Sequence, residues 1–153
     1  MKISVIIPTL GKRDSLYPLF ESLLRQDLPN NQFEILVIGN LENPNLRKWV
    51  QAFQAKMNIS LFFTNTLGVN RARNLGIEKS KAGLLVFLDD DCVISDLHFL
   101  EKILRLHEEN PEAAAIGGPY LAVPQAKYRE LAYVQVCRVW LEASRIGKKQ
   151  TFD

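Results

Sequence analysis

The chain has few of the residues that mark disulfide-rich, zinc-binding or membrane-spanning proteins. Its two cysteines, Cys92 and Cys137, lie far apart without a Cys-x-x-Cys spacing, which predicts two reduced thiols in a cytoplasmic protein. Its two histidines, His98 and His107, have no partners at metal-ligand spacing, which argues against a zinc site. No apolar run approaches the length of a bilayer span, and the first, residues 3–7, is too short for a signal peptide.

A strong charge of either sign is also missing. The sequence has 19 Lys and Arg against 17 Asp and Glu, a net charge of +2. So small a charge supplies no field that would attract nucleic acid, and we expect no nucleic-acid partner. The composition is that of a soluble globular domain, with 47% hydrophobic and 24% charged residues. A chain of 153 residues is long enough to bury one substantial core.

Strand-like and helix-like segments alternate along this chain. Short runs of apolar and β-branched residues predict the strands, and apolar residues at helical spacing predict the helices. The predicted strands cover residues 2–8, 33–38, 59–64 and 84–88, with a weak fifth at 113–116. The predicted helices cover residues 14–27, 44–57, 71–83, 96–107 and 126–149. The alternation indicates an α/β fold with a mostly parallel sheet and helices on both faces.

Particular residues predict how three of these helices begin. Asp14 or Ser15 is a candidate N-cap of the first helix, and Asp96 of the fourth. Pro44 is suited to the first turn of the second helix. In that helix Trp49 has the spacing of a core residue.

The most informative stretch is residues 84–91, where five apolar residues lead directly into three carboxylates. The apolar run predicts a strand buried on both faces, with the carboxylates at the mouth of the crevice where open α/β sheets bind ligands. A divalent cation or well-placed donors would offset the repulsion between the three anions. In an extended segment Asp89 and Asp91 would point to one side and Asp90 to the other. The alternative is an acidic turn without a ligand.

Polar or flexible residues also follow the other predicted strands. Thr9, Gly39 and the loop at residues 64–68 end the first three strands. Because parallel strands end at one edge of a sheet, we expect these residues to line one crevice with the aspartates. Mg²⁺ and Mn²⁺ bind one or two carboxylates and take their other ligands from water and substrate phosphates. The sequence therefore predicts a site for a metal ion and a diphosphate.

Three motifs occur in order along the chain: Ser4-Val-Ile-Ile-Pro-Thr9, Gly68-x-x-x-Ala-Arg-Asn-x-Gly76 and Phe87-Leu-Asp-Asp-Asp91. Together they resemble a family 2 glycosyltransferase with the Rossmann-like GT-A fold, over about residues 2–119. The resemblance implies transfer of a sugar from a nucleotide-diphospho-sugar, with a UDP-sugar as the first candidate, to an acceptor hydroxyl. It implies inversion at the anomeric carbon and a glycan or lipid-linked acceptor.

The resemblance also implies roles on the nucleoside side of the site. Pro8, Thr9 and Leu10 would contact the nucleoside. The family's second strand usually ends in an aspartate that helps to read the base, whereas this chain has Gly39 and Asn40 there. Asn40 would still be able to bond a base edge, and the identity of the base is left open.

On the charged side of the site, the resemblance implies that Arg73 lies near the nucleotide or its phosphates, with Arg71 competing for that role. The aspartates would form the family's Asp-x-Asp motif. Asp89 would lie near the ribose, with Asp90 also in the donor-binding set. Asp91, together with Asp89, would hold Mn²⁺ or Mg²⁺.

The general base of an inverting transfer has no match to the family's motif in this chain. After Pro119 the only carboxylates are those of Glu130, Glu142 and Asp153. We therefore expect the base beyond Asp153, and a truncated domain that carries the donor-binding half of a longer enzyme. In this interpretation residues 1–123 form the GT-A core.

Residues 124–153 would form a helical segment that begins the missing acceptor-binding part. This segment is basic and amphipathic, and we expect its apolar face to pack on that part. The alternative is peripheral contact with the inner face of the plasma membrane.

Two other functions remain open from the sequence. The segment from Leu88 to Val93 fits the first motif of a haloacid-dehalogenase-like phosphatase, in which Asp89 would be the nucleophile. Three strands precede this segment, however, and no later paired carboxylates complete such a site. The second alternative is a module that binds a nucleotide-sugar without turnover.

Overall fold

The computed structural model describes residues 1–117. The chain divides into two units, Met1–Pro111 and Glu112–Asp153, and the fold below is that of the first. Strands and helices alternate, as predicted. In chain order the elements are β1 (Ile3–Thr9), α1 (Arg13–Leu24), β2 (Phe33–Gly39), α2 (Pro44–Gln54), β3 (Ile59–Phe63), α3 (Val69–Lys79), β4 (Leu84–Phe87) and α4 (Phe99–Glu109).

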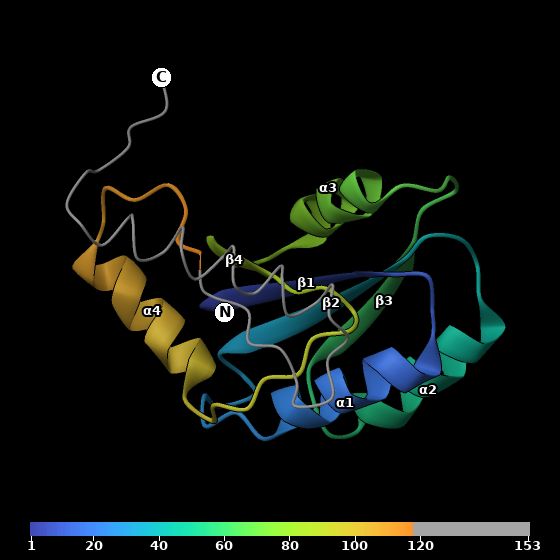
Figure 1. Cartoon of the computed structure of the whole chain (residues 1–153), viewed down its shortest axis with the longest axis horizontal. Coiled ribbons are helices and arrows are strands. Elements are labelled where there is room, and N and C mark those ends of the chain that lie inside the picture. Colours follow the sequence, from blue (N-terminus) through green and yellow to red (C-terminus); the bar gives the residue numbers. More distant parts are fainter. Residues whose placement is uncertain (118–153) are drawn as a thin grey trace, which may run out of the picture. The chain divides into compact units, whose positions relative to one another are not determined.

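The four strands form one parallel sheet in the order β3-β2-β1-β4 (Figure 1). β1 lies between β2 and β4, with Ile3 paired to Phe33 on one side and to Leu84 on the other. All seven residues of β1 are buried, as expected of a central strand whose two faces are both covered. From β1 the chain winds outward through β2 and β3 and then returns to the opposite side of β1 with β4.

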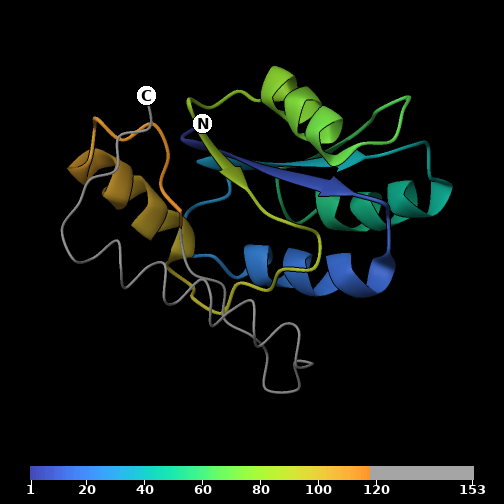
Figure 2. The same cartoon turned by 45° about the horizontal axis from the view of Figure 1, so that its top comes forward.

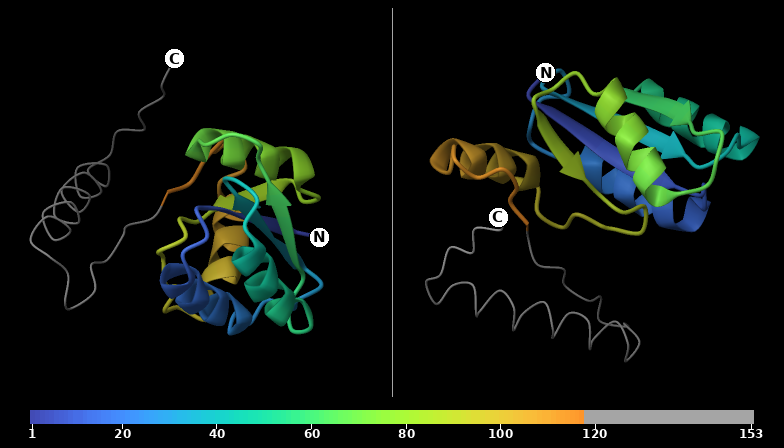
Figure 3. Two further views of the ribbon diagram at one scale, coloured as in Figure 1. Left: turned by 90° about the vertical axis from the view of Figure 1, so that its right-hand side faces the viewer. Right: turned by 90° about the horizontal axis from the view of Figure 1, so that it is seen from above.

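The helices cover the two faces of this sheet unequally. α1 and α2 lie along one face, and α3 lies along the other (Figures 2 and 3). A large hydrophobic cluster lies under α1 and α2 and includes Leu16, Phe20, Leu46 and Val50. Because side chains alternate along a strand, Val5 and Ile7 of β1 face this large cluster, whereas Ile6 faces α3. Leu100 of α4 belongs to the large cluster as well.

Helix α3 packs very closely on the sheet at Gly76. A Cβ atom at this position would lie 2.4 Å from Cγ2 of Ile6, which is far inside van der Waals contact. Ala72, one turn earlier on the same face, is fully buried. The small residues of the Ala-Arg-Asn-x-Gly segment thus allow α3 to approach β1.

A buried polar network joins the start of the sheet to the segment before β4. The Ser4 hydroxyl donates to Oε1 of Glu34 at 2.7 Å and accepts the Ala82 N–H at 3.1 Å. The same Glu34 oxygen accepts the Lys81 N–H at 2.7 Å. These bonds satisfy a carboxylate that is 2% exposed, and they fix where the chain enters β4.

Two predictions about strands are wrong. β4 is less buried than predicted: within residues 1–117 it is an edge strand with a neighbour only on the β1 side, and Phe87 is 42% exposed. Residues 113–116 form no strand. Their three alanines have weak strand propensity, and this run was the shortest of those predicted.

Two predicted helix starts are also wrong. α1 begins at Arg13 with Lys12 at the N-cap and no side-chain cap bond, rather than after Asp14 or Ser15. α4 begins at Phe99, because Asp96 accepts the His98 N–H at 3.0 Å in a turn that precedes the helix. Asp96 is therefore a turn residue and not the N-cap.

The start of α2 at Pro44 is as predicted, and Asn43 caps it through bonds from two backbone N–H groups. Trp49 packs against the large cluster, also as predicted. None of the helices within residues 1–117 has the length and apolar character needed to cross a membrane. The predicted helix at 126–149 and the predicted boundary at residue 123 lie outside the described residues.

Candidate functional site

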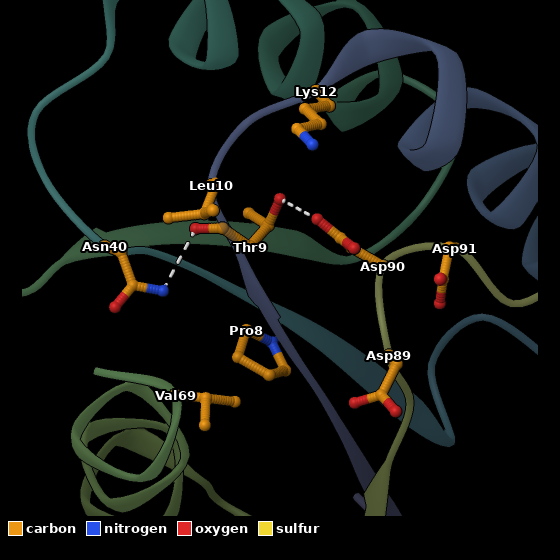
Figure 4. A pocket seen from close by; sticks show the side chains of 9 residues that line it. All are labelled: Pro8, Thr9, Leu10, Lys12, Asn40, Val69, Asp89, Asp90 and Asp91. Carbon is orange, nitrogen blue, oxygen red and sulfur yellow. Dashed lines mark hydrogen bonds between the residues drawn. The ribbon is translucent and has the colours of Figure 1, made fainter. Parts of the chain in front are cut away.

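A cleft of about 340 Å³ opens at the carboxyl ends of the strands (Figure 4). Its volume is within the range of small-molecule sites. The residues predicted to bind the donor or a metal ion all line it except Arg73, whereas Gly39 and the loop at residues 64–68, which were also expected at this crevice, do not. The lining residues are Pro8, Thr9, Leu10, Lys12, Asn40, Val69, Asp89, Asp90 and Asp91.

The position of this cleft follows from the strand order. The chain leaves β1 toward β2 on one side and reaches β4 on the other, so the crossovers diverge between β1 and β4. Open α/β sheets bind ligands in the crevice at such a switch point. Thr9 ends β1, and Asp89 to Asp91 follow β4, so the topology brings together residues some 80 positions apart in sequence.

Thr9 connects these two strand ends directly. Its hydroxyl donates to Oδ2 of Asp90 at 2.5 Å and accepts the N–H of Gly11 at 2.8 Å. Thr9 is 2% exposed, so the bond to the carboxylate starts from an almost completely buried residue. A short bond from a hydroxyl to an ionised carboxylate is among the stronger hydrogen bonds in proteins.

Asn40 connects the ends of β1 and β2 to the start of α3. Its backbone N–H donates to the Thr9 carbonyl at 3.0 Å, and its side-chain NH₂ lies 3.4 Å from the same oxygen. Its Oδ1 accepts the N–H of Gly68 at 2.8 Å. Gly68 is the N-cap of α3 and has φ +144°, a conformation that L side chains rarely adopt, so the motif's first glycine is required here.

Arg73 and Arg71, two candidates for one role, have different partners. Arg73 forms an ion pair with Asp89, with Nη2 and Oδ1 2.9 Å apart. Arg71 instead donates to the hydroxyl of Thr66 at 2.8 Å, away from the aspartates. Only Arg73 therefore acts on the acidic stretch.

The aspartates do not continue the strand. β4 ends at Phe87, and Asp90 and Asp91 lie in a turn, with the Cys92 N–H donating to the Asp89 carbonyl at 3.2 Å. The predicted extended segment through Asp91 is therefore wrong. The turn allows all three carboxylates to line one cleft.

The three carboxylates differ in their partners. Asp89 is bound by Arg73 and Asp90 by Thr9, whereas Asp91 is exposed and forms no bond to a residue in the described part. Within residues 1–117, no three His, Cys, Asp or Glu side chains are grouped to hold a metal ion. A metal ion here would therefore take one or two carboxylates from the described residues and its other ligands from water or phosphates, which is a common arrangement for Mg²⁺.

Hydrogen bonds join the segment after the aspartates to α1 and to the loop that follows α1. The Ser22 hydroxyl accepts the Ile94 N–H at 3.2 Å. Gln26 donates from its amide to the Asp96 carbonyl at 2.9 Å and accepts the Leu100 N–H at 3.1 Å. Cys92 packs against the large cluster, and burial raises the pKa of its thiol, as expected of a packing residue rather than a nucleophile.

The cleft has an apolar part and a charged part (Figure 4). Pro8, Leu10 and Val69 supply apolar surface beside the Asn40 amide, and the aspartates lie on the other side with Lys12. Sequence analysis missed Lys12 and Val69. Lys12 lies between the end of β1 and the start of α1, and Val69 is the first residue of α3, after the end of β3. Their position shortly after a predicted strand end was the signal that would have identified them.

A parallel, doubly wound sheet with a cleft at its switch point defines a Rossmann-like α/β domain that binds its ligand at the strand ends. The sequence profile of glycosyl transferase family 2 matches residues 4–149, and the chain belongs to this family. The family resemblance seen in the sequence is thereby confirmed. A phosphatase with Asp89 as nucleophile has no support from the comparison.

Several curated glycosyltransferases are similar in sequence. The poly(ribitol-phosphate) beta-N-acetylglucosaminyltransferase TarS of Staphylococcus aureus is 27% identical over 137 residues, which cover 86% of this chain and 24% of TarS. An uncharacterized glycosyltransferase of Rickettsia bellii is 34% identical over 112 residues, 71% of this chain and 15% of that protein. The chain thus spans about a quarter or less of the length of these relatives.

Solved structures confirm the GT-A-like fold. S. aureus TarS 1–349 in complex with UDP-GlcNAc has a TM-score of 0.68 and 24% identity, covering 84% of this chain and 38% of that one. The mannosyltransferase PcManGT of Pyrobaculum calidifontis, in complex with GDP-Man and Mn²⁺, has a TM-score of 0.64 and 17% identity, covering 87% and 38%.

Proposed function

We propose that this chain is the donor-binding part of a glycosyltransferase that moves a sugar from a nucleotide-diphospho-sugar to an acceptor hydroxyl with inversion. The observation that carries the proposal is the two-part cleft at the switch point of a family 2 chain. Its apolar part suits a nucleoside, and its charged part suits a metal-bound diphosphate. Support also comes from relatives in complex with UDP-GlcNAc and with GDP-Man and Mn²⁺.

The donor would lie with its nucleoside against Pro8, Leu10 and Val69. Its diphosphate would then face Lys12 and the aspartates. Lys12 is exposed, and no ion pair between its ammonium and the described residues competes for a phosphate. An ammonium group is a suitable point charge for a phosphate oxygen.

The residues present fit a single divalent cation. Asp91 would hold it, because its carboxylate faces the cleft and, among residues 1–117, has no partner. When bound, Mn²⁺ or Mg²⁺ would offset the charge of the departing diphosphate. Asp89 would contact the donor while it stays paired with Arg73, and this ion pair fixes the direction of its carboxylate.

The acceptor and the general base belong to the whole protein. We infer a glycan or lipid-linked acceptor, and a base that lies beyond Asp153, as the sequence predicts. Peripheral contact of the basic segment with a membrane remains a prediction about residues that the structure does not describe.

The test is calorimetric titration of the 153-residue chain with UDP, in the presence and absence of Mn²⁺. We expect binding that depends on the metal. Absence of metal-dependent binding for UDP, GDP, CDP and ADP alike would contradict the proposal. In the whole protein, a module without turnover would bind UDP-GlcNAc but release no UDP from it when an acceptor is supplied.

Asp91→Asn is the sharper variant. It removes the charge that a cation needs while keeping the shape of the side chain. We expect the dependence on Mn²⁺ to disappear and the melting temperature to stay the same, because Asp91 is exposed. Unchanged metal-dependent binding would show that Asp91 is not the ligand.

A further inference from the structure

We propose that Asp90 serves the donor site as a positioning residue: the Thr9 hydroxyl clamps its carboxylate, and this clamp sets the turn from which Asp89 and Asp91 reach the ligand. The inference rests on the proposed function. It gives the middle aspartate a role different from the donor contact predicted from the sequence.

The direction of the Thr9 hydroxyl proton is fixed by its surroundings. The N–H of Gly11 donates to Oγ1 of Thr9 at 2.8 Å, so this oxygen already acts as an acceptor. Its own proton is then available for Oδ2 of Asp90, which lies 2.5 Å away. The hydroxyl and the carboxylate are thus complementary partners.

The clamp starts from a rigid part of the molecule. Thr9 pairs with Gly39 in the parallel ladder between β1 and β2, and its carbonyl accepts the Asn40 N–H at 3.0 Å. The ladder to β4, by contrast, stops at the pair Ile6–Phe87, with one further bond from the Leu88 N–H to the Ile6 carbonyl. Beyond Leu88, among residues 1–117, the hydrogen bond of the Thr9 hydroxyl is what joins the turn to β1.

The clamp is also part of a closed circuit around the cleft. Asp90 is bound to Thr9, Thr9 to Asn40, and Asn40 through Gly68 to the start of α3. Arg73 of α3 returns to Asp89, the residue next to Asp90. Asp89 is bound by Arg73 of α3, and Asp90 is bound by Thr9 of β1. Asp91 lies between Asp90, which Thr9 holds in place, and Cys92, which packs against the large cluster.

Positioning and ligand contact make opposite predictions for an amide at residue 90. An amide oxygen still accepts the Thr9 hydroxyl proton, so Asp90→Asn keeps the clamp but loses the charge. A carboxylate that binds a cation or repels a phosphate depends on that charge. Asp90→Ala removes the clamp and the charge together.

The experiment is titration of the 153-residue chain with UDP and Mn²⁺. We expect Asp90→Asn and Thr9→Ser to bind within about threefold of the wild type, and Asp90→Ala and Thr9→Val to bind about tenfold more weakly or worse. Asp91→Asn is the contrasting variant and should lose the metal dependence. The inference is overturned if Asp90→Asn behaves like Asp91→Asn, or if Asp90→Ala and Thr9→Val both bind like the wild type.

A double-mutant cycle separates the clamp from two independent contacts. If Thr9 acts through Asp90, the variant with both Thr9→Val and Asp90→Ala should bind no more weakly than the weaker single variant. If the double variant instead loses affinity by the product of the two single losses, the inference is overturned. If Thr9→Val fails to fold, the comparison of Asp90→Asn with Asp90→Ala still decides, because Asp90 is only half-buried. A wild-type chain that binds no nucleoside diphosphate would instead overturn the proposed function.

Discussion

The two faces of the sheet differ in what their side chains do. Under α1 and α2 lies the large cluster, which is made of aliphatic and aromatic residues and includes Leu100 of α4. Under α3 the buried apolar cluster is small, and the Ser4–Glu34 network lies on that side of β1 and β2. α3 also supplies Arg73 to the site. The comparison teaches that one face mainly stabilises the fold while the other mainly positions the site.

The largest expected effect concerns the stabilising face. Phe20 is 1% exposed and packs edge-on against Phe53, with ring centroids 5.1 Å apart. We expect Phe20→Ala to lower the free energy of unfolding by about 3–5 kcal/mol, because it leaves a large cavity. Urea denaturation measures this change. Phe20→Leu is the matched control, and a loss below about 1 kcal/mol for Phe20→Ala would contradict the comparison.

An intermediate effect is expected where α3 meets the sheet. Gly76→Ala brings a methyl group against Ile6, and overpacking of this kind costs about 1–3 kcal/mol. The cost should fall sharply in an Ile6→Ala background, because that change removes the atom that the new methyl meets. Denaturation of the four proteins in this cycle measures the coupling. Equal costs in both backgrounds would show that α3 does not rest on Ile6.

The smallest effect on stability is expected at Arg73. Its ion pair with Asp89 is partly exposed, so Arg73→Ala should change the free energy of unfolding by less than about 1 kcal/mol. We nevertheless expect about tenfold weaker binding of UDP with Mn²⁺, because Asp89 loses the group that directs it. Arg71→Ala is the matched control on the same helix and should bind normally. Equal losses of affinity in both variants would mean that the positive charge of α3, and not the ion pair between Arg73 and Asp89, determines UDP binding.

Much of the fold was predictable because its signals are local. β1, β2 and β3 are β-branched or aromatic runs, and each lies within a residue or two of its predicted range. β4 was correctly located but wrongly taken as fully buried, because an apolar run does not reveal which strand lies at the edge. The start of α1 was missed because no side chain caps it.

The candidate site was predicted as a set but not as a geometry. The rule that parallel strands end at one edge placed Thr9 and Asp89–Asp91 together, and the family resemblance added Asn40; the cleft contains all of these. The partners of each carboxylate depend on the turn after β4 and on where Arg73 falls on α3. Such tertiary pairings leave no pattern in the sequence.

Strand β1 is fully buried and carries alternate residues to two faces with different tasks. Removing a single residue from it would therefore exchange the aliphatic and polar positions and withdraw Thr9 from the rim. Insertions and deletions in related genes should consequently fall in the connecting loops and spare this strand, whatever donor or acceptor each enzyme has come to use.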